Sequence, residues 1–148
     1  MYKKILVPLD GSKRAERILP HVEKLAHDND ATVIFLTVTR APRVFGYDDM
    51  QYAHFQKEIE SVMGEAETYV KGLRGEFQAK GIEARHQAVM GPVVKEILDA
   101  AQRENVDLVA MCSHGQGGMS RLFYGSVASG ILNRIDRPLL IIRARRDA

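Results

Sequence analysis

The sequence predicts an α/β protein in which an open, doubly wound parallel sheet of five strands carries helices on both faces. Short runs of apolar and β-branched residues recur five times along the chain, and a helical pattern separates each run from the next. Strands that alternate with helices are joined by right-handed crossovers, which build a parallel sheet. Most of the runs are apolar at consecutive positions, as strands covered on both faces are. The length of 148 residues suits one domain, at about 150 residues per domain.

The five predicted strands differ in how apolar they are. The third run is weaker and alternates, with polar side chains at every second position in Glu83, Arg85 and Gln87, which is typical of an edge strand. The other four are nearly continuous in apolar character, so we expect both faces of the sheet to be covered. The five runs span residues 5–9, 32–38, 83–89, 108–111 and 139–142.

The first predicted helix follows Ser12, which is a suitable N-cap. Apolar residues then recur at spacings of three and four up to Ala26. Pro20 lies inside this segment, where it removes one backbone hydrogen bond at a cost of about 3 kcal/mol. We therefore expect a helix that is kinked at Pro20.

The second predicted helix is long. It spans residues 49–80, and Gly81 provides its C-terminal stop. At 1.5 Å per residue it would be roughly 45 Å long, which exceeds the sheet that it covers. Three internal glycines, at positions 64, 72 and 75, leave open whether it is continuous. Its apolar stripe comprises Phe55, Ile59, Val62, Ala66, Tyr69, Leu73 and Phe77.

Two shorter helices complete the predicted pattern. Pro92 suits the first turn of the third helix, whose apolar stripe runs from Val93 to Ala101. The fourth helix spans residues 126–135. We expect four of its residues to face inward, namely Val127, Ile131, Leu132 and Ile135.

Composition narrows the classes of function. The chain has 21 Lys and Arg against 19 Asp and Glu, and this net charge of +2 is too balanced for a protein whose main partner is nucleic acid. The single cysteine, Cys112, excludes an internal disulfide framework. No window approaches the ~18 continuous apolar residues of a membrane span, and the apolar start of the chain is too short for a signal peptide. We expect a cytoplasmic protein without nucleic-acid or membrane partners.

Glycine-rich segments adjoin the predicted strands at positions where a ligand could bind. In a doubly wound sheet the ligand crevice lies outside the carboxyl ends of the strands. Residues 8–12 follow the first strand and residues 112–120 follow the fourth, while Gly125-Ser126 opens the last helix. Glycines let backbone N–H groups approach an anion, and a helix start adds free N–H groups and a positive dipole end. The pattern favours a phosphate site, although neither G-x-G-x-x-G nor a P-loop is present and isolated glycines more often mark turns.

The spacing of these glycines resembles a family signature. Gly115, then nine residues, then Gly125-Ser126 resembles the nucleotide-binding signature of the universal stress protein family, and so does the opening segment 5–12. The resemblance covers the whole chain and includes Gly91-Pro92 and the closing segment 137–142. It implies one universal stress protein domain over residues 1–148, with a Rossmann-like strand order of 3-2-1-4-5.

The resemblance also implies an adenine nucleotide, ATP or AMP, with Mg²⁺ as a candidate companion. Asp10 matches the family aspartate at the adenine and ribose end, and Val38 matches an adenine-contacting position. Residue types alone suggest other roles, because Asp10 suits a turn cap, Val38 a core position and Ser126 an N-cap. The binding residues that the resemblance implies are Pro8, Asp10, Val38, Met111, Gly115, Gln116, Gly125, Ser126 and Val127.

The chain departs from the family signature at Cys112, which stands where the first signature glycine would be. A Cβ and a sulfur therefore take the place at which ATP-binding members bring bare backbone against the ribose and phosphates. This departure favours a second hypothesis, a dimeric interaction protein that binds no nucleotide. A third hypothesis is a slow ATP hydrolase.

The order of residues shows no catalytic arrangement. It contains no Ser/His/Asp pattern or paired carboxylates, and the histidines lack metal-ligand spacing. Residues 112–120 include no lysine to neutralise a γ-phosphate, as efficient phosphoryl transfer needs. We therefore expect a binding protein without catalytic residues or a metal site of its own.

The last predicted strand suits an interface between two copies of the chain. The family resemblance implies a homodimer in which these strands pair antiparallel. An apolar edge strand is a liability unless it is covered, which agrees with that pairing. The residues concerned are Leu139, Leu140, Ile141 and Ile142.

Overall fold

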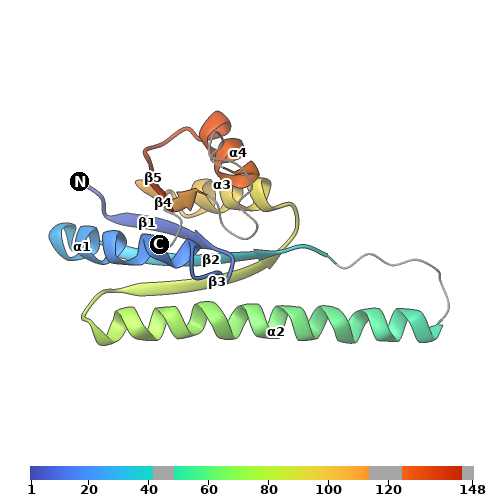
Figure 1. Cartoon of the computed structure of the whole chain (residues 1–148). Coiled ribbons are helices and arrows are strands. Elements are labelled where there is room, and N and C mark those ends of the chain that lie inside the picture. Colours follow the sequence, from blue (N-terminus) through green and yellow to red (C-terminus); the bar gives the residue numbers. More distant parts are fainter. Residues whose placement is uncertain (42–48, 114–124, 145–148) are drawn as a thin grey trace.

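Five parallel strands form one sheet in the order β3-β2-β1-β4-β5, as predicted (Figure 1). The structure is a computed structural model that describes residues 1–41, 49–113 and 125–144. Its strands are β1 (Lys4–Leu9), β2 (Thr32–Thr39), β3 (Ala84–Met90), β4 (Leu108–Ser113) and β5 (Leu139–Arg143). Its helices are the short 3-10 helix η1 (Ala15–Ile18), α1 (Leu19–Asn29), α2 (Asp49–Ala79), α3 (Val93–Arg103) and α4 (Ser126–Arg134).

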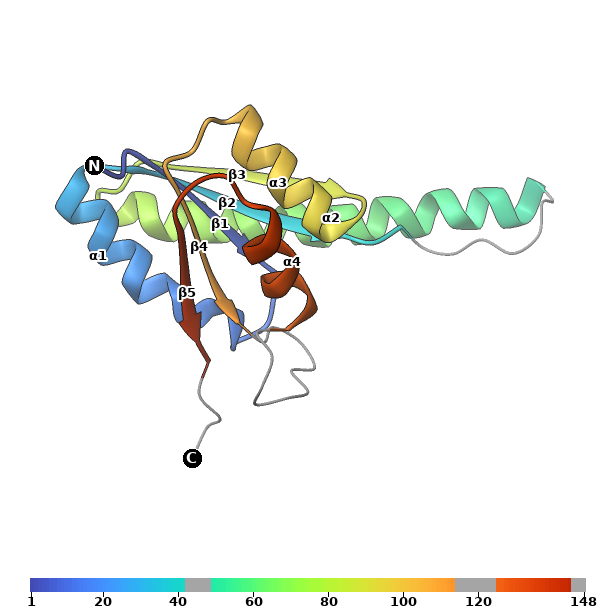
Figure 2. The same cartoon turned by 90° about the horizontal axis from the view of Figure 1, so that it is seen from above.

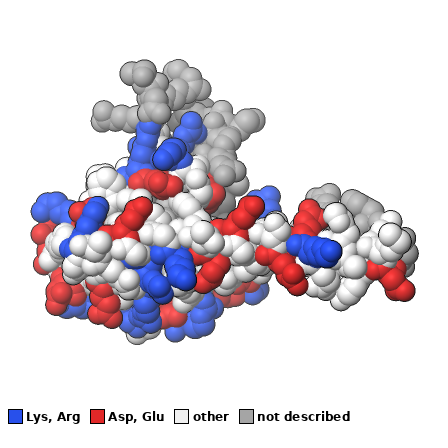
Figure 3. Space-filling view, turned by 90° about the horizontal axis from the view of Figure 1, so that it is seen from below, with Lys and Arg blue, Asp and Glu red and all other residues white. Residues whose placement is uncertain are grey.

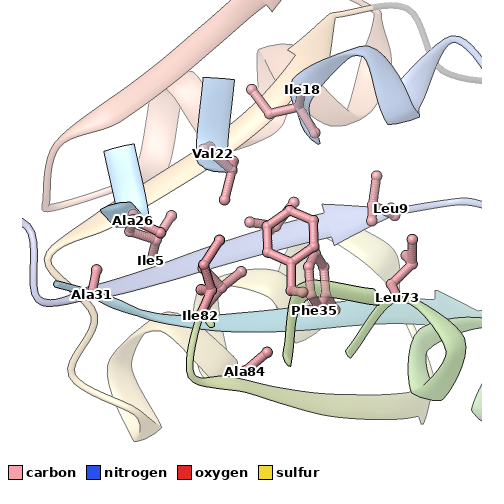
Figure 4. Packing of buried hydrophobic residues seen from close by; sticks show 14 of the residues in the cluster. Ile5, Leu9, Ile18, Val22, Ala26, Ala31, Phe35, Leu73, Ile82 and Ala84 are labelled. Atoms are coloured by element: carbon pink, nitrogen blue, oxygen red, sulfur yellow. The ribbon is translucent and has the colours of Figure 1, made fainter. Parts of the chain in front are cut away.

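Helices cover both faces of the sheet (Figure 2). The alternation of side chains along β1 sends Val7 and Leu9 to one face and Leu6 to the other. We call the first core the α1/α2 layer and the second the α3/α4 layer, after the helices that pack there. Figure 4 shows the α1/α2 layer, in which the Phe35 and Phe77 rings meet edge to face with centroids 4.8 Å apart. Burial on both sides explains why the strands are continuously apolar.

The segment predicted as one kinked helix is instead the 3-10 helix η1 followed by α1. Pro20 lies in the first turn of α1, where its missing N–H costs no hydrogen bond because these N–H groups have no partner within the helix. Ser12 does cap the start of the segment, since its Oγ accepts a hydrogen bond from the Ala15 N–H at 3.0 Å. The expectation of one helix that runs across Pro20 is therefore wrong, because the α-helix begins just before this residue.

The long helix α2 is continuous over 31 residues. At 1.5 Å per residue it measures about 46 Å, whereas eight-residue strands such as β2 span only about 26 Å. Its N-terminal part extends past the end of the sheet (Figure 1), and we call residues 49–63 the α2 arm. Residues Ala66, Val70, Leu73 and Phe77 are buried. Phe55, Ile59 and Val62, which were expected on the buried stripe, are only half-buried because they belong to the arm.

The two edges of the sheet differ in character. β3 forms one edge, as its alternating sequence predicts, and β5 forms the other. The apolar residues of β5 are all only partly buried. Leu132, which was expected to face inward, is 48% exposed, because α4 lies near this edge and buries only the narrower stripe that contains Ala128 and Ile131.

Charges of both signs are mixed over the surface. Figure 3 shows Lys and Arg interspersed with Asp and Glu on the face of the molecule that α2 covers. The Lys80 ammonium lies 2.8 Å from a Glu23 carboxylate oxygen, and Lys24 lies 3.0 Å from Asp28. Such exposed ion pairs contribute at most about 1 kcal/mol each. No helix in the described part of the chain is both long and apolar enough to cross a membrane.

Candidate nucleotide-binding site

The predicted binding residues that the structure describes lie toward the edge of the sheet where the strands end. Pro8 is buried near the end of β1, and Asp10 follows that strand in an exposed turn. Val38 is the next-to-last residue of β2, and Met111 lies in the second half of β4. Gly125 precedes α4, which starts at the same edge because it leads back to the beginning of β5. This is where a doubly wound sheet places its ligand crevice.

Three of the residues form an apolar surface on one face of the sheet. Met111 is buried in the α3/α4 layer at 6% exposure, and Val38 and Val127 pack against the same layer while remaining partly buried. They come from β4, β2 and the first turn of α4, so the fold joins positions that are far apart in the sequence. We call Val38, Met111 and Val127 the apolar floor. It offers the apolar contact that a purine ring requires.

The turn after β1 is shaped by Asp10. Its Oδ1 accepts a hydrogen bond from the Ser12 N–H at 2.9 Å, so the turn-capping role that its residue type suggests is confirmed. Gly11 between them has φ +87°, a left-handed conformation that favours glycine. The turn holds Asp10 in an exposed position at the carboxyl edge of the sheet.

The start of α4 offers hydrogen-bond donors. Gly125, rather than Ser126, is the N-cap, and its φ of +87° and ψ of 157° favour glycine. The Gly125 carbonyl accepts the first helical hydrogen bond, from the Ser129 N–H at 2.9 Å. No side chain of the described residues caps this helix. Its first N–H groups therefore place the positive end of the helix dipole at the carboxyl edge of the sheet.

Cys112 lies within β4 and not in the loop that was expected after residue 111. Its side chain belongs to the α1/α2 layer, on the face opposite to Met111. Burial raises the pKa of the thiol, while the Arg17 charge and a hydrogen bond with the Ile18 backbone act in the other direction. The Cys112 side chain therefore lies on the face of the sheet opposite to the apolar floor, and whether its sulfur affects nucleotide binding stays a prediction.

Ser113 is a site residue that the sequence pattern did not single out. It is the last residue of β4, it is 0% exposed, and it pairs in register with Arg143 of β5. Its Oγ has no hydrogen-bond partner in the described part of the chain. A serine between Cys112 and a glycine-rich segment gives no sign of burial in the sequence. That Ser113 ends β4 and is buried there becomes known only from the structure.

Two of the nine predicted binding residues, Gly115 and Gln116, lie outside the described residues. The other seven lie toward one edge of the sheet, and their binding role stays a prediction. Within residues 1–41, 49–113 and 125–144, no three His, Cys, Asp or Glu side chains gather as metal ligands.

The strand order 3-2-1-4-5, together with a glycine-capped helix at the carboxyl edge, defines a Rossmann-like α/β domain. The model of the universal stress protein family matches residues 1–143. The chain therefore belongs to the universal stress protein family.

The alignment with individual relatives covers nearly the full length of both chains. The universal stress protein MJ0577 of Methanocaldococcus jannaschii is 27% identical over 159 aligned residues, which cover 99% of this chain and 98% of the relative. The solved structure of MJ0577 superposes with a TM-score of 0.84 at 28% identity, covering 100% of this chain and 99% of that one.

Two more distant structures share the fold. One is a universal stress protein in complex with cAMP, at 21% identity and a TM-score of 0.64, with 97% of this chain and 98% of that chain covered. The other is a family member from Arabidopsis thaliana with AMP bound, at 14% identity and a TM-score of 0.66, with 98% and 94% covered. At these identities the likeness concerns the fold.

Proposed function

We propose that this protein binds an adenine nucleotide, ATP or AMP, at the carboxyl edge of the sheet and serves as a regulatory module in a stress response. The observation that carries the proposal is the meeting of the apolar floor with the glycine-capped start of α4, which share Val127. An adenine ring needs apolar contact, and phosphates need N–H donors in a positive potential. The apolar floor and the start of α4 support the proposal because they offer one feature of each kind at the same edge of the sheet.

We assign one part of the carboxyl edge to each part of the proposed ligand. Adenine would lie at the ends of β1 and β2, near Pro8 and Val38, with Asp10 at its ribose side. The phosphates would accept hydrogen bonds from the N–H groups that follow Gly125. The predicted residues Gly115 and Gln116 would complete this cradle, and the phosphate oxygens of ATP would bring Mg²⁺ with them.

The relatives support the choice of an adenine ligand. Proteins of this fold have been solved with cAMP and with AMP. A bound nucleotide regulates only to the extent that it binds two states of the protein with different affinity. The proposed module therefore requires that nucleotide binding alter the crevice rim or the contacts with a partner.

Calorimetric titration with ATP, ADP and AMP, each with and without Mg²⁺, tests the proposal directly. We expect measurable heat and a rise in the melting temperature, because a ligand that binds only the folded state stabilises it by RT ln(1 + [L]/Kd). If millimolar nucleotide produced neither heat nor a thermal shift, the protein would be an interaction module with a vestigial crevice.

A negatively charged residue at the start of α4 should weaken phosphate binding without lowering the stability of the fold. Ser126→Asp places a carboxylate in the first turn, which should preserve or raise the stability of the helix. The same carboxylate would repel phosphate, so we expect the Kd for ATP to rise about tenfold or more, since about 1.4 kcal/mol corresponds to tenfold. Ser126→Asn is the matched neutral control and should bind nearly as the parent does. Equal affinity in the parent and Ser126→Asp would place the phosphates elsewhere.

We also propose that two copies pair through β5. Its four apolar residues are partly buried, and β5 forms an edge of the sheet within the chain. Antiparallel pairing with a second β5 would join the two sheets and cover this edge. Light scattering at micromolar concentration should give the mass of a dimer, and a monomer mass would contradict the proposal.

A further inference from the structure

One buried hydroxyl group, at the end of β4, has no hydrogen-bond partner among the described residues. Ser113 is 0% exposed, and its Oγ makes no hydrogen bond to the residues that the structure describes. Buried side-chain oxygens in native proteins are nearly always hydrogen-bonded, so an exception indicates a binding function, a bound water or strain. The position of Ser113 decides between these explanations.

The fold places this hydroxyl at the corner where α4 begins. Side chains alternate along β4, so Ser113 faces the same layer as Met111, two residues earlier. The first turn of α4 packs on that layer too, through the buried Ala128. Figures 1 and 2 show β4 and α4 leaving the same end of the sheet. Two independent features, an uncapped helix start and a buried unpartnered hydroxyl, therefore share one corner.

The chemistry of this corner selects an oxygen-rich anion. The N–H groups at the start of α4 can only donate, and the helix dipole makes their surroundings positive. The Ser113 hydroxyl can donate one hydrogen bond to the same acceptor group. A cationic donor would satisfy the hydroxyl but not the N–H groups of the helix start, and a neutral acceptor would gain nothing from the charge of the helix dipole. A phosphate has several acceptor oxygens and can satisfy both.

We propose that the Ser113 hydroxyl donates a hydrogen bond to a phosphate oxygen of the bound nucleotide. This inference rests on the proposed nucleotide binding and adds a ligand contact that lies outside the nine predicted residues. Because Ser113 has no exposed surface, the atoms above it must move aside when the phosphate enters. Phosphate binding is therefore coupled to a local rearrangement at the end of β4.

Ser113→Ala provides a test with two readouts. Its Kd for ATP should rise about tenfold, which corresponds to about 1.4 kcal/mol. The melting temperature of the ligand-free protein should not fall, because an unpartnered hydroxyl contributes no hydrogen bond to the folded state. Adenosine, which has no phosphate, should bind the parent and Ser113→Ala equally well.

Thr37→Val is the matched control. Thr37 is the other buried polar residue in the described chain, at 6% exposure. It alternates with Val33 and Phe35 on β2 and so faces the opposite, α1/α2 layer. Removing this hydroxyl should leave the Kd for ATP unchanged, which shows that losing a buried hydroxyl does not by itself weaken binding.

The outcomes separate this inference from the proposed function. If the parent protein binds no adenine nucleotide, the proposed function fails and the Ser113 contact fails with it. If the parent binds ATP and Ser113→Ala binds it equally well, only the Ser113 contact is overturned. A lower melting temperature of ligand-free Ser113→Ala with an unchanged Kd would also overturn it, since the hydroxyl would then have a structural partner.

Discussion

Cys112 and Ser113 are neighbours in β4 that face opposite layers of the core. The cysteine side chain packs among the residues of the α1/α2 layer, whereas the serine lies on the side of the apolar floor. A departure from the family signature therefore need not disturb ligand binding. What matters is the face onto which the new side chain projects.

Replacing Cys112→Gly should lower stability and leave nucleotide affinity unchanged. The loss of a buried side chain and the added backbone freedom should together reduce the free energy of unfolding by about 2 kcal/mol. Urea unfolding measures the first effect and calorimetry the second, with Cys112→Ala as the variant that keeps the Cβ. A substantial gain in ATP affinity would show that the sulfur does obstruct the ligand.

Tyr69 connects α2 to η1. Its hydroxyl donates a hydrogen bond to Glu16 Oε2 at 2.8 Å. Burial, followed by this bond and the charge of Glu16, raises the pKa of Tyr69 above its usual range near 10. Above pH 10 the unfolded chain therefore loses this proton before the folded protein does, and the free energy of unfolding falls as pH rises.

Tyr69→Phe should remove part of this pH dependence. We expect a loss of about 1 kcal/mol at pH 7, from the missing hydrogen bond, and a shallower decline between pH 9.5 and 11. The difference in slope should stay below the limit of about 1.4 kcal/mol per pH unit, because Tyr69 is only half-buried and solvent screens its interactions. Tyr52→Phe, in the exposed arm, is the control. Parallel pH profiles for the parent and Tyr69→Phe would exclude this role.

Among the elements, α2 carries glycines that the fold does not require. A Cβ built at Gly72 or Gly75 meets no atom within 4 Å, and neither residue has a positive φ. Alanine at either position should raise the free energy of unfolding by about 0.5–1 kcal/mol, because glycine loses more backbone entropy in a helix. Chemical denaturation measures the change.

Gly81 gives the opposite expectation at the end of the same helix. Its φ is +80°, so an alanine there is strained although the space is open. We expect Gly81→Ala to destabilise the protein by about 1 kcal/mol. Equal effects at Gly72 and Gly81 would mean that helix propensity does not govern this segment.

Element boundaries could be predicted only where local chemistry determines them. The long apolar periodicity indicated α2, and the alternation in residues 83–89 indicated an edge strand. Pro20 was misplaced because a proline in the first turn and a proline at a kink look alike in sequence when a 3-10 helix precedes. The exposure of Phe55 and Leu132 depends on where the sheet ends, and a residue pattern contains no such information.

For the whole molecule, a charge in β5 should weaken association. Ile142 packs against the α1/α2 layer while remaining partly exposed. Ile142→Lys places a charge where two β5 strands would pair, so we expect dissociation to monomers in light scattering. Circular dichroism checks that the variant is folded. A folded Ile142→Lys protein that keeps the mass of a dimer would place the interface elsewhere.

The general position of the site follows from the topology, but its finer composition does not. Parallel strands end at one edge, so Asp10, Val38 and Gly125 could be expected near one another before the fold was known. Ser113 could not, because the residue pattern does not show that β4 continues to residue 113 and is buried there. The direction of the Cys112 side chain could not be predicted either, because it follows from the continuation of β4 through residue 113.

The two parts of helix α2, the arm and the turns that rest on the sheet, differ in local stability. Turns that rest on the sheet open only at a large cost, whereas turns of the arm have few tertiary contacts, such as the 3.4 Å hydrogen bond that the Thr39 hydroxyl donates to Met63 Sδ, and isolated helices of this length are marginal in water. Backbone amides of residues 49–63 should therefore exchange with solvent much faster than those around Phe77, although both belong to the same unbroken spiral. A protease or a binding partner would meet the arm as a segment that unwinds independently of the domain to which it is attached.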